Sequence, residues 1–243
     1  VSNNGVGIAG TMGSRVKLLA SKGMDRQGSG STTNIVNAFN YAVEKGAHVV
    51  SMSLGGRGTN PPFQQALQQA VSKGVVVVIA AGNDNLQMST TNWFSPASYA
   101  SAISGAMAVG STASGNSRSS FSNYSTQYVE IGAPGTNIYS TLMSGGYGNM
   151  SGTSMATPIA AGAAGLAIGL LKARGVVVTP ALVEQVMQAG AVKDQGLSQY
   201  FKEGNRLNLL NLAKYIDSRY PASGPNPTPN PTPNPTRGPT PGP

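Results

Sequence analysis

The sequence contains no cysteine and only one histidine, His48. The lack of cysteine excludes disulfide bonds, thiolate metal sites and a cysteine nucleophile. A single imidazole also excludes any site that needs two. Charge is scarce, because only 10% of the 243 residues are Asp, Glu, Lys or Arg, whereas 40% are hydrophobic. A chain of this length and composition can bury a core and is not a charge-driven disordered protein.

Acidic residues are few, with 8 against 16 basic residues and a formal net charge of +8. Such a balance can indicate a polyanionic partner. The basic residues are scattered, however, and no aromatic side chains lie among the densest group to stack on bases. That group comprises Arg15, Lys17, Lys22 and Arg26. We therefore predict a basic surface without nucleic acid as a partner.

Both ends of the chain are unusual. Residues 221–243 repeat Pro-Asn-Pro-Thr and carry almost nothing apolar, which predicts an extended linker. Val1 is not a methionine, and the segment that it begins lacks the features of a signal peptide. We interpret both ends as cuts in a longer chain, with one folded domain over residues 1–220.

Hydrophobic periodicity alternates between helix and strand. Residues 33–45 place apolar side chains on one helical face, and residues 48–53 then form a buried strand pattern. Pro61–Pro62 open a second amphipathic helix. Residues 75–79 are β-branched and apolar throughout, as a strand covered on both faces must be. This order predicts an α/β layered fold with a parallel sheet.

Residues 151–171 carry no charge and contain Gly165 and Gly169 in a small-xxx-small spacing, which allows a membrane span. The segment also contains Pro158 and begins with polar residues. We therefore predict a helix buried at the centre of a soluble domain and no membrane partner.

Three loops are candidates for a site, because ligands of α/β sheets bind at the carboxyl ends of the strands. They are Ser53–Gly56, Ala80–Asn83 and the segment before the central helix. Ser154, at the start of that helix, would alone be read as a helix cap. The combination of segments favours a catalytic role instead.

Five motifs occur in one order along the chain. They are Ser51-Met-Ser-Leu-Gly-Gly56, Ala80-Ala-Gly-Asn83, Phe121-Ser-Asn-Tyr124, Ala133-Pro-Gly135 and Gly152-Thr-Ser-Met-Ala-Thr-Pro158. In sequence and spacing they resemble the subtilisin family of serine proteases, from about Asn3 to about Asp217. The resemblance implies a three-layer α/β/α fold with a mostly parallel central sheet, its amino-terminal part missing here.

The resemblance assigns two catalytic residues. Ser154 would be the nucleophile that attacks the scissile carbonyl. Asn83 would form the oxyanion hole together with the backbone N–H of Ser154. The helix N-terminus at Ser154 suits this role, because its free N–H groups favour developing negative charge.

The resemblance also implies a binding groove for an extended peptide, gripped on both sides by added strands. The gripping segments would be Gly28, Ser29 and Gly30 on one side and Ser53, Leu54 and Gly55 on the other. The walls of the pocket for the residue before the cut would be Ala80, Ala81 and Gly82 opposite Gly55 and Gly56. Since these wall residues are small, we expect a roomy pocket that favours large apolar or aromatic side chains.

A calcium site is suggested near the amino end. Asn3–Val6 match the beginning of a loop that binds structural calcium in the family, and Asn4 would offer a side-chain oxygen. The family's remaining ligands precede Val1, so half of the site at best is present. No cofactor is expected for the chemistry.

The catalytic base is not evident in this sequence. The family order is aspartate, histidine, serine, and the resemblance places the first two before Val1. His48 begins the strand that leads to Leu54, about 17 Å away at roughly 3.3 Å per residue. A general base must lie within hydrogen-bond reach of the hydroxyl, so we interpret His48 as a bystander.

The favoured interpretation is a secreted serine endopeptidase that forms an acyl-enzyme on Ser154. Its catalytic Asp and His would come from an upstream segment, and the 243 residues alone would show little turnover. Polypeptides would be substrates and an inhibitory propeptide a further partner. The alternative is a catalytically silent protease-like module that binds peptides, although such a module needs neither Ser154 nor Asn83.

Overall fold

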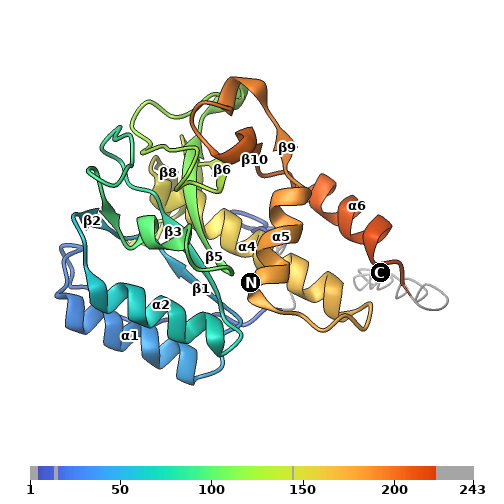
Figure 1. The fold of residues 1–243 in the computed structure, drawn as a ribbon, viewed down its shortest axis with the longest axis horizontal. Helices are drawn as coiled ribbons and strands as arrows, with labels where there is room; N and C mark the ends of the chain where they lie inside the picture. The colour runs from blue at the N-terminus through green and yellow to red at the C-terminus, as the bar shows by residue number, and fades with distance from the viewer. Residues whose placement is uncertain (1–4, 14–15, 144, 223–243) are drawn as a thin grey trace, which may run out of the picture.

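The structure is a computed structural model that describes residues 5–13, 16–143 and 145–222. The protein folds into three layers. Helices lie on both faces of a central sheet (Figure 1). The first face carries α1 (Thr32–Glu44) and α2 (Pro61–Ser72), which lie side by side, and the second carries α4 (Thr153–Lys172) and α5 (Pro180–Ala189). Helix α6 (Leu209–Arg219) packs on α4 and α5. The predicted three-layer α/β/α fold is confirmed.

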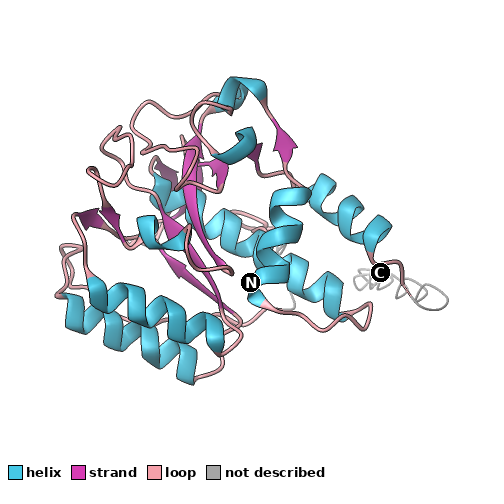
Figure 2. Cartoon of the chain, viewed as in Figure 1, coloured by secondary structure: helices cyan, strands magenta, loops and turns pink. Residues whose placement is uncertain are grey.

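The six-stranded sheet has the order β1-β3-β5-β6-β10-β9, and it runs through the middle of the molecule (Figure 2). The strands are β1 (Val49–Met52), β3 (Val76–Ala80), β5 (Ala106–Thr112), β6 (Ile131–Pro134), β9 (Val192–Lys193) and β10 (Asn205–Arg206). All neighbours are parallel except β9, which pairs antiparallel with β10. The predicted parallel sheet is therefore confirmed.

Two short antiparallel ribbons lie outside this sheet, and periodicity did not predict them. One pairs β2 (Gly56–Arg57) with β4 (Phe94–Ser95), and the other pairs β7 (Ile138–Thr141) with β8 (Tyr147–Met150). The remaining short elements are α3 (Ala97–Ala100), η1 (Ser114–Asn116), η2 (Gln195–Leu197) and η3 (Lys202–Gly204).

The core is divided by the sheet into two clusters. Val77 and Ile79 of β3 point to the side of α1 and α2, whereas Val76 and Val78 point to the side of α4. Each of these side chains is at most 1% exposed. Burial on both faces explains why the strand is apolar throughout instead of alternating.

Helix α4 is the central helix of the second cluster. By length and composition alone it is long and apolar enough to cross a membrane. Eleven of its residues are nevertheless buried within the protein, and six of these are alanines. Small side chains allow the helix to pack closely on β1, β3, β5 and β6. The prediction of a buried core helix is confirmed.

The predicted linker over residues 221–243 lies outside the described residues, apart from Pro221 and Ala222. Asn4, the predicted calcium ligand, is also outside them. The linker and the calcium ligand therefore stay predictions.

Candidate active site

Three segments distant in sequence meet at one edge of the sheet. Ser53–Gly56 follows β1, Ala80–Asn83 includes and follows the end of β3, and Thr153–Ser154 begins α4. Residues from all three line one groove with a volume of about 730 Å³. The groove lies at the carboxyl ends of parallel strands, where ligands of open α/β sheets bind.

Ser154 is the second residue of α4 and is half-buried beside this groove. Among the described residues, none is hydrogen-bonded to its hydroxyl or to its backbone N–H. The first N–H groups of a helix have no intrahelical acceptor, and the helix dipole gives them a partial positive charge. The Ser154 N–H is therefore a ready donor to an anion next to the hydroxyl.

The backbone of Ser154 is fixed from the sheet. Pro158 lies four residues further along α4 and has no N–H, so it cannot donate to the Ser154 carbonyl as an ordinary helical residue would. The hydroxyl of Ser53 donates to that carbonyl instead, at 2.9 Å. The loop after β1 thus holds the start of the helix at the position of the serine.

The side chain of Asn83 is oriented by Thr153. Its Oδ1 accepts from the backbone N–H of Thr153 at 2.8 Å and from the Thr153 hydroxyl at 2.9 Å. Because both donors occupy the oxygen, the amide Nδ2 is turned away from them. Nδ2 has no acceptor among the described residues, and Asn83 is exposed. Asn83 Nδ2 and Ser154 N–H are two unpaired donors on adjoining segments.

Thr153 and Asn123 support this arrangement, and neither was predicted as a site residue. Thr153 is fully buried, and its hydroxyl also accepts from Gly82 N–H at 3.2 Å. Asn123, also fully buried, accepts through Oδ1 from the backbone N–H of Asp84 and of Leu86, both at 2.9 Å. Both residues lie within motifs that carried the family resemblance, which was the available signal.

The same Asn123 side chain donates to the carbonyl of Ala81 at 2.8 Å. Ala81, predicted as a pocket wall, is itself fully buried and does not line the groove, whereas Ala80 and Gly82 do. The loop that presents Asn83 is consequently held at several backbone positions.

The other predicted groove residues are brought together in the same groove. Gly28, Ser29 and Gly30 line the same groove as Ser53, Leu54, Gly55 and Gly56. The Gly30 N–H and the Ser53 carbonyl find no hydrogen-bond partner among the residues that the structure describes. Such groups can pair with the backbone of an extended peptide laid between them.

The pocket between the expected walls differs from the roomy one predicted. A β-carbon added to Gly55 would overlap Cε1 of Phe94, and one added to Gly82 would lie 2.6 Å from Cζ of the same ring. Phe94 also lines the groove and is 6% exposed. The small wall residues leave room that a ring of the protein itself occupies.

His48 lies far from Ser154. Its Nε2 is 3.1 Å from Nζ of Lys172, the last residue of α4, whereas Ser154 is near the first. Eighteen residues of helix at about 1.5 Å each put roughly 27 Å between these two ends. His48 is thus excluded as the base for Ser154, as the sequence predicted.

Among the residues with described placement, no group of three or more His, Asp or Glu could hold a metal ion. The proposed calcium ligand Asn4 is outside that part of the chain.

A serine beside two unpaired N–H donors can be acylated and can hold the resulting oxyanion. On a parallel α/β sheet with a peptide-sized groove, this arrangement is of the serine-hydrolase class. The chain belongs to the subtilase family (peptidase family S8), because the model of that family matches residues 1–205.

Individual relatives agree with this assignment. Over 88% of its length the chain is 41% identical to thermitase of Thermoactinomyces vulgaris and 41% identical to a thermophilic serine proteinase of Bacillus sp. (strain AK1). It spans 71% and 49% of these two proteins, respectively. Subtilisin NAT of Bacillus subtilis subsp. natto is 42% identical over 68% of the chain, which spans 42% of that relative.

Solved structures are similar in fold as well. A cold-adapted subtilisin-like serine proteinase superposes with a TM-score of 0.65 and 33% identity, over 76% of this chain and 63% of the other. The prenylagaramide maturation protease PagA superposes with a TM-score of 0.67 and 27% identity, over 79% of this chain and 70% of the other.

Proposed function

We propose that the protein hydrolyses peptide bonds as a serine endopeptidase, through an acyl-enzyme on Ser154. The observation that carries this proposal is the orientation of Asn83. The backbone N–H and the hydroxyl of Thr153 both donate to Oδ1 of Asn83, so Nδ2 of Asn83 stays available beside the unpaired N–H of Ser154. Two donors placed where negative charge develops stabilise a tetrahedral intermediate, and a structural role would not require the pair.

The proposal includes a general base from a segment outside this sequence. The single histidine, His48, is hydrogen-bonded to Lys172 at the far end of α4. The Ser154 hydroxyl has no hydrogen-bond partner among the described residues. The family resemblance places the histidine and the aspartate before Val1. An extracellular location and an inhibitory propeptide stay predictions of that resemblance.

The groove supports a polypeptide as the substrate. Gly30 and Ser53 line it and offer a backbone donor and a backbone acceptor with which an extended chain can pair, and Ser154 lines the same groove. The same feature is all that a catalytically silent peptide-binding module would need. The two functions therefore differ in whether Ser154 reacts.

The test uses the full-length protein that contains this chain, with a Ser154→Ala variant as its matched control. Fragments of an unfolded protein substrate, such as denatured casein, are counted with time by mass spectrometry. We expect cleavage by the unaltered protein and none above background by Ser154→Ala. Equal cleavage by both proteins, or binding of peptides without cleavage by either, would contradict the proposal.

A further inference from the structure

The ring of Phe94 stands against both walls of the pocket at once. An added β-carbon on Gly55 would overlap its Cε1, and one on Gly82 would lie 2.8 Å from this same atom. Both glycines line the groove next to Ser154. A substrate side chain that entered between the walls would need the volume that the ring already fills.

The backbone of Phe94 is fixed by the β2–β4 ribbon. Phe94 is paired with Arg57 of β2, and its N–H donates to the hydroxyl of Ser98 at 3.1 Å. The hydroxyl of Ser95 donates to the carbonyl of Gly58 at 2.6 Å. Bonds at Phe94 and at the residue after it therefore fix the direction in which its side chain leaves the strand.

The ring belongs to a packed cluster. It is 6% exposed and lies in the core on the side of α1 and α2. The preceding Trp93 packs edge-on against Tyr99 and Tyr128, with ring centroids 5.1 and 5.7 Å apart. To leave the pocket, the Phe94 ring would have to give up this burial, which opposes its displacement by an incoming side chain.

We propose that Phe94 determines specificity by limiting the pocket to small side chains. In the peptidase activity proposed above, on which this inference rests, the residue just before the cleaved bond is then Gly, Ala or Ser. A small side chain fits over the ring, whereas a large apolar or aromatic one must displace it. Pockets discriminate by about 10- to 200-fold for a single surplus or missing methylene, and an aromatic ring is a larger surplus.

The experiment measures binding, so that it does not depend on catalysis. Acetylated tetrapeptides Ala-Ala-Ala-Ala and Ala-Ala-Ala-Phe, which differ only at the last residue, are titrated calorimetrically into the full-length protein carrying Ser154→Ala. We expect the peptide that ends in Ala to bind at least about tenfold more tightly than the one that ends in Phe.

Enlarging the pocket should remove this preference. In Phe94→Ala, we expect the affinity for the peptide that ends in Phe to rise by about tenfold or more. The affinity for the peptide that ends in Ala should stay within about threefold of its value in the protein that retains Phe94. Phe94→Leu should shift the ratio of the two peptide affinities in the same direction but by less. It replaces Phe94→Ala in the experiment if that variant does not fold. Phe39→Ala is the matched control, since it truncates a phenylalanine that is 5% exposed in the same core, away from the groove.

Three results would overturn the proposal. They are a preference for the peptide that ends in Phe in the presence of Phe94, an equal shift in Phe39→Ala, and failure of both peptides to bind. Failure of the proposed function is seen separately, as the absence of cleavage by the protein with Ser154 intact. If the protein selects peptides by size but does not cleave them, the role of Phe94 in the pocket is supported and the proposed peptidase activity is contradicted.

Discussion

At the scale of single residues, the site depends on which atom of an amide faces which neighbour. Asn83 has one oxygen and one nitrogen at the end of its side chain, and Thr153 binds the oxygen from two directions. The nitrogen is left as a donor beside Ser154. A buried threonine thus decides whether the asparagine can stabilise an oxyanion.

Replacing Asn83 by Ala should therefore slow catalysis more than it weakens binding. We expect kcat of the full-length protein to fall by about 10²–10³-fold with KM little changed, the loss known for removal of the oxyanion-hole asparagine from a subtilisin. Asn83→Asp is the informative companion, because it keeps an acceptor for Thr153 but has no N–H. Recovery of activity in Asn83→Asp would contradict the assigned role of Nδ2.

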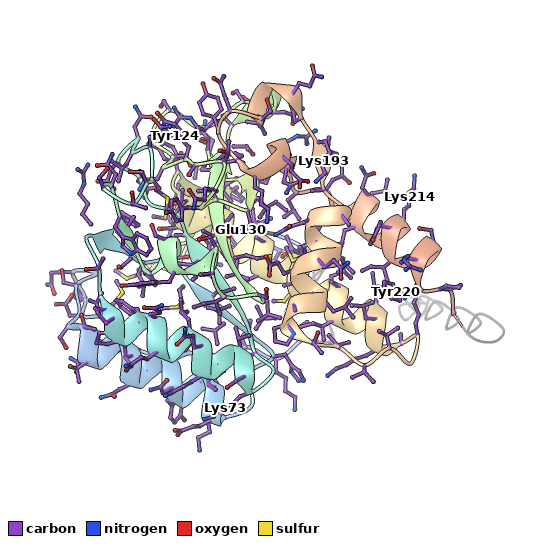
Figure 3. The ribbon with its side chains drawn as sticks, in the orientation of Figure 1. Lys73, Tyr124, Glu130, Lys193, Lys214 and Tyr220 are labelled. Atoms are coloured by element: carbon purple, nitrogen blue, oxygen red, sulfur yellow. The ribbon has the colours of Figure 1, made fainter. Side chains whose placement is uncertain are left out.

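Glu130 gives a residue-scale prediction of pH dependence. It lies toward the middle of the molecule, as Figure 3 shows, is 2% exposed, and accepts from the N–H of Ala108 at 2.6 Å. Burial raises its pKa from 4.5 to about 8, with Glu184 adding to the rise and the Ala108 bond and Lys202 opposing it. The native state then retains a proton that the unfolded state loses above pH 4.5.

The free energy of unfolding should therefore fall as pH rises from about 4.5 to 8, by about 1 kcal/mol per pH unit from this group. In Glu130→Gln the side chain cannot ionise, so that part of the slope should disappear. Urea unfolding at a series of pH values measures both proteins. An identical slope in the two would show that Glu130 does not hold its proton in the folded protein.

At the scale of elements, the loop after β3 is held in place by a side chain from a distant segment. Asn123 accepts from two backbone N–H groups of the loop and donates to the Ala81 carbonyl. The strand delivers the loop to the sheet edge, but Asn123 determines its course there. The geometry of Asn83 is thereby linked to the fold of residues 121–124.

Truncation of Asn123 to Ala should disturb both stability and activity. It leaves the buried carbonyl of Ala81 and two part-buried N–H groups without their partner, and a fully buried group left so costs about 1–3 kcal/mol. We expect a loss of about 2–5 kcal/mol in the free energy of unfolding and a lower kcat, measured by urea unfolding and peptide hydrolysis. Asn92→Ala is the control, because Asn92 is exposed and its side chain donates only to Gln87. Unchanged kcat in a folded Asn123→Ala protein would show that the loop keeps its course without this anchor.

At the scale of the whole molecule, local patterns predicted the layers, and contacts between distant residues determined the rest. The run 75–79 is apolar over its full length, so β3 and its burial could be predicted from adjacent residues. Ser154 and Asn83 could be singled out because each belongs to a short motif.

The supporting residues could not be found in this way. Thr153 acts on a residue 70 positions away, and Asn123 on one 39 positions away. The position of the Phe94 ring depends on how the two-residue strand β4 pairs with β2, and two residues carry no period to reveal which side faces the groove. Long-range pairing, which a sequence pattern does not record, therefore decides the shape of the pocket.

The central claim is that Ser154 is an activated nucleophile, and a fluorophosphonate probe tests it most directly. The full-length protein is treated with the probe, digested, and the labelled peptide mapped by mass spectrometry, with Ser154→Ala in parallel. We predict one label per chain on Ser154 and none in the variant. A folded protein that stays unlabelled, or that carries the label on another serine, would contradict the account.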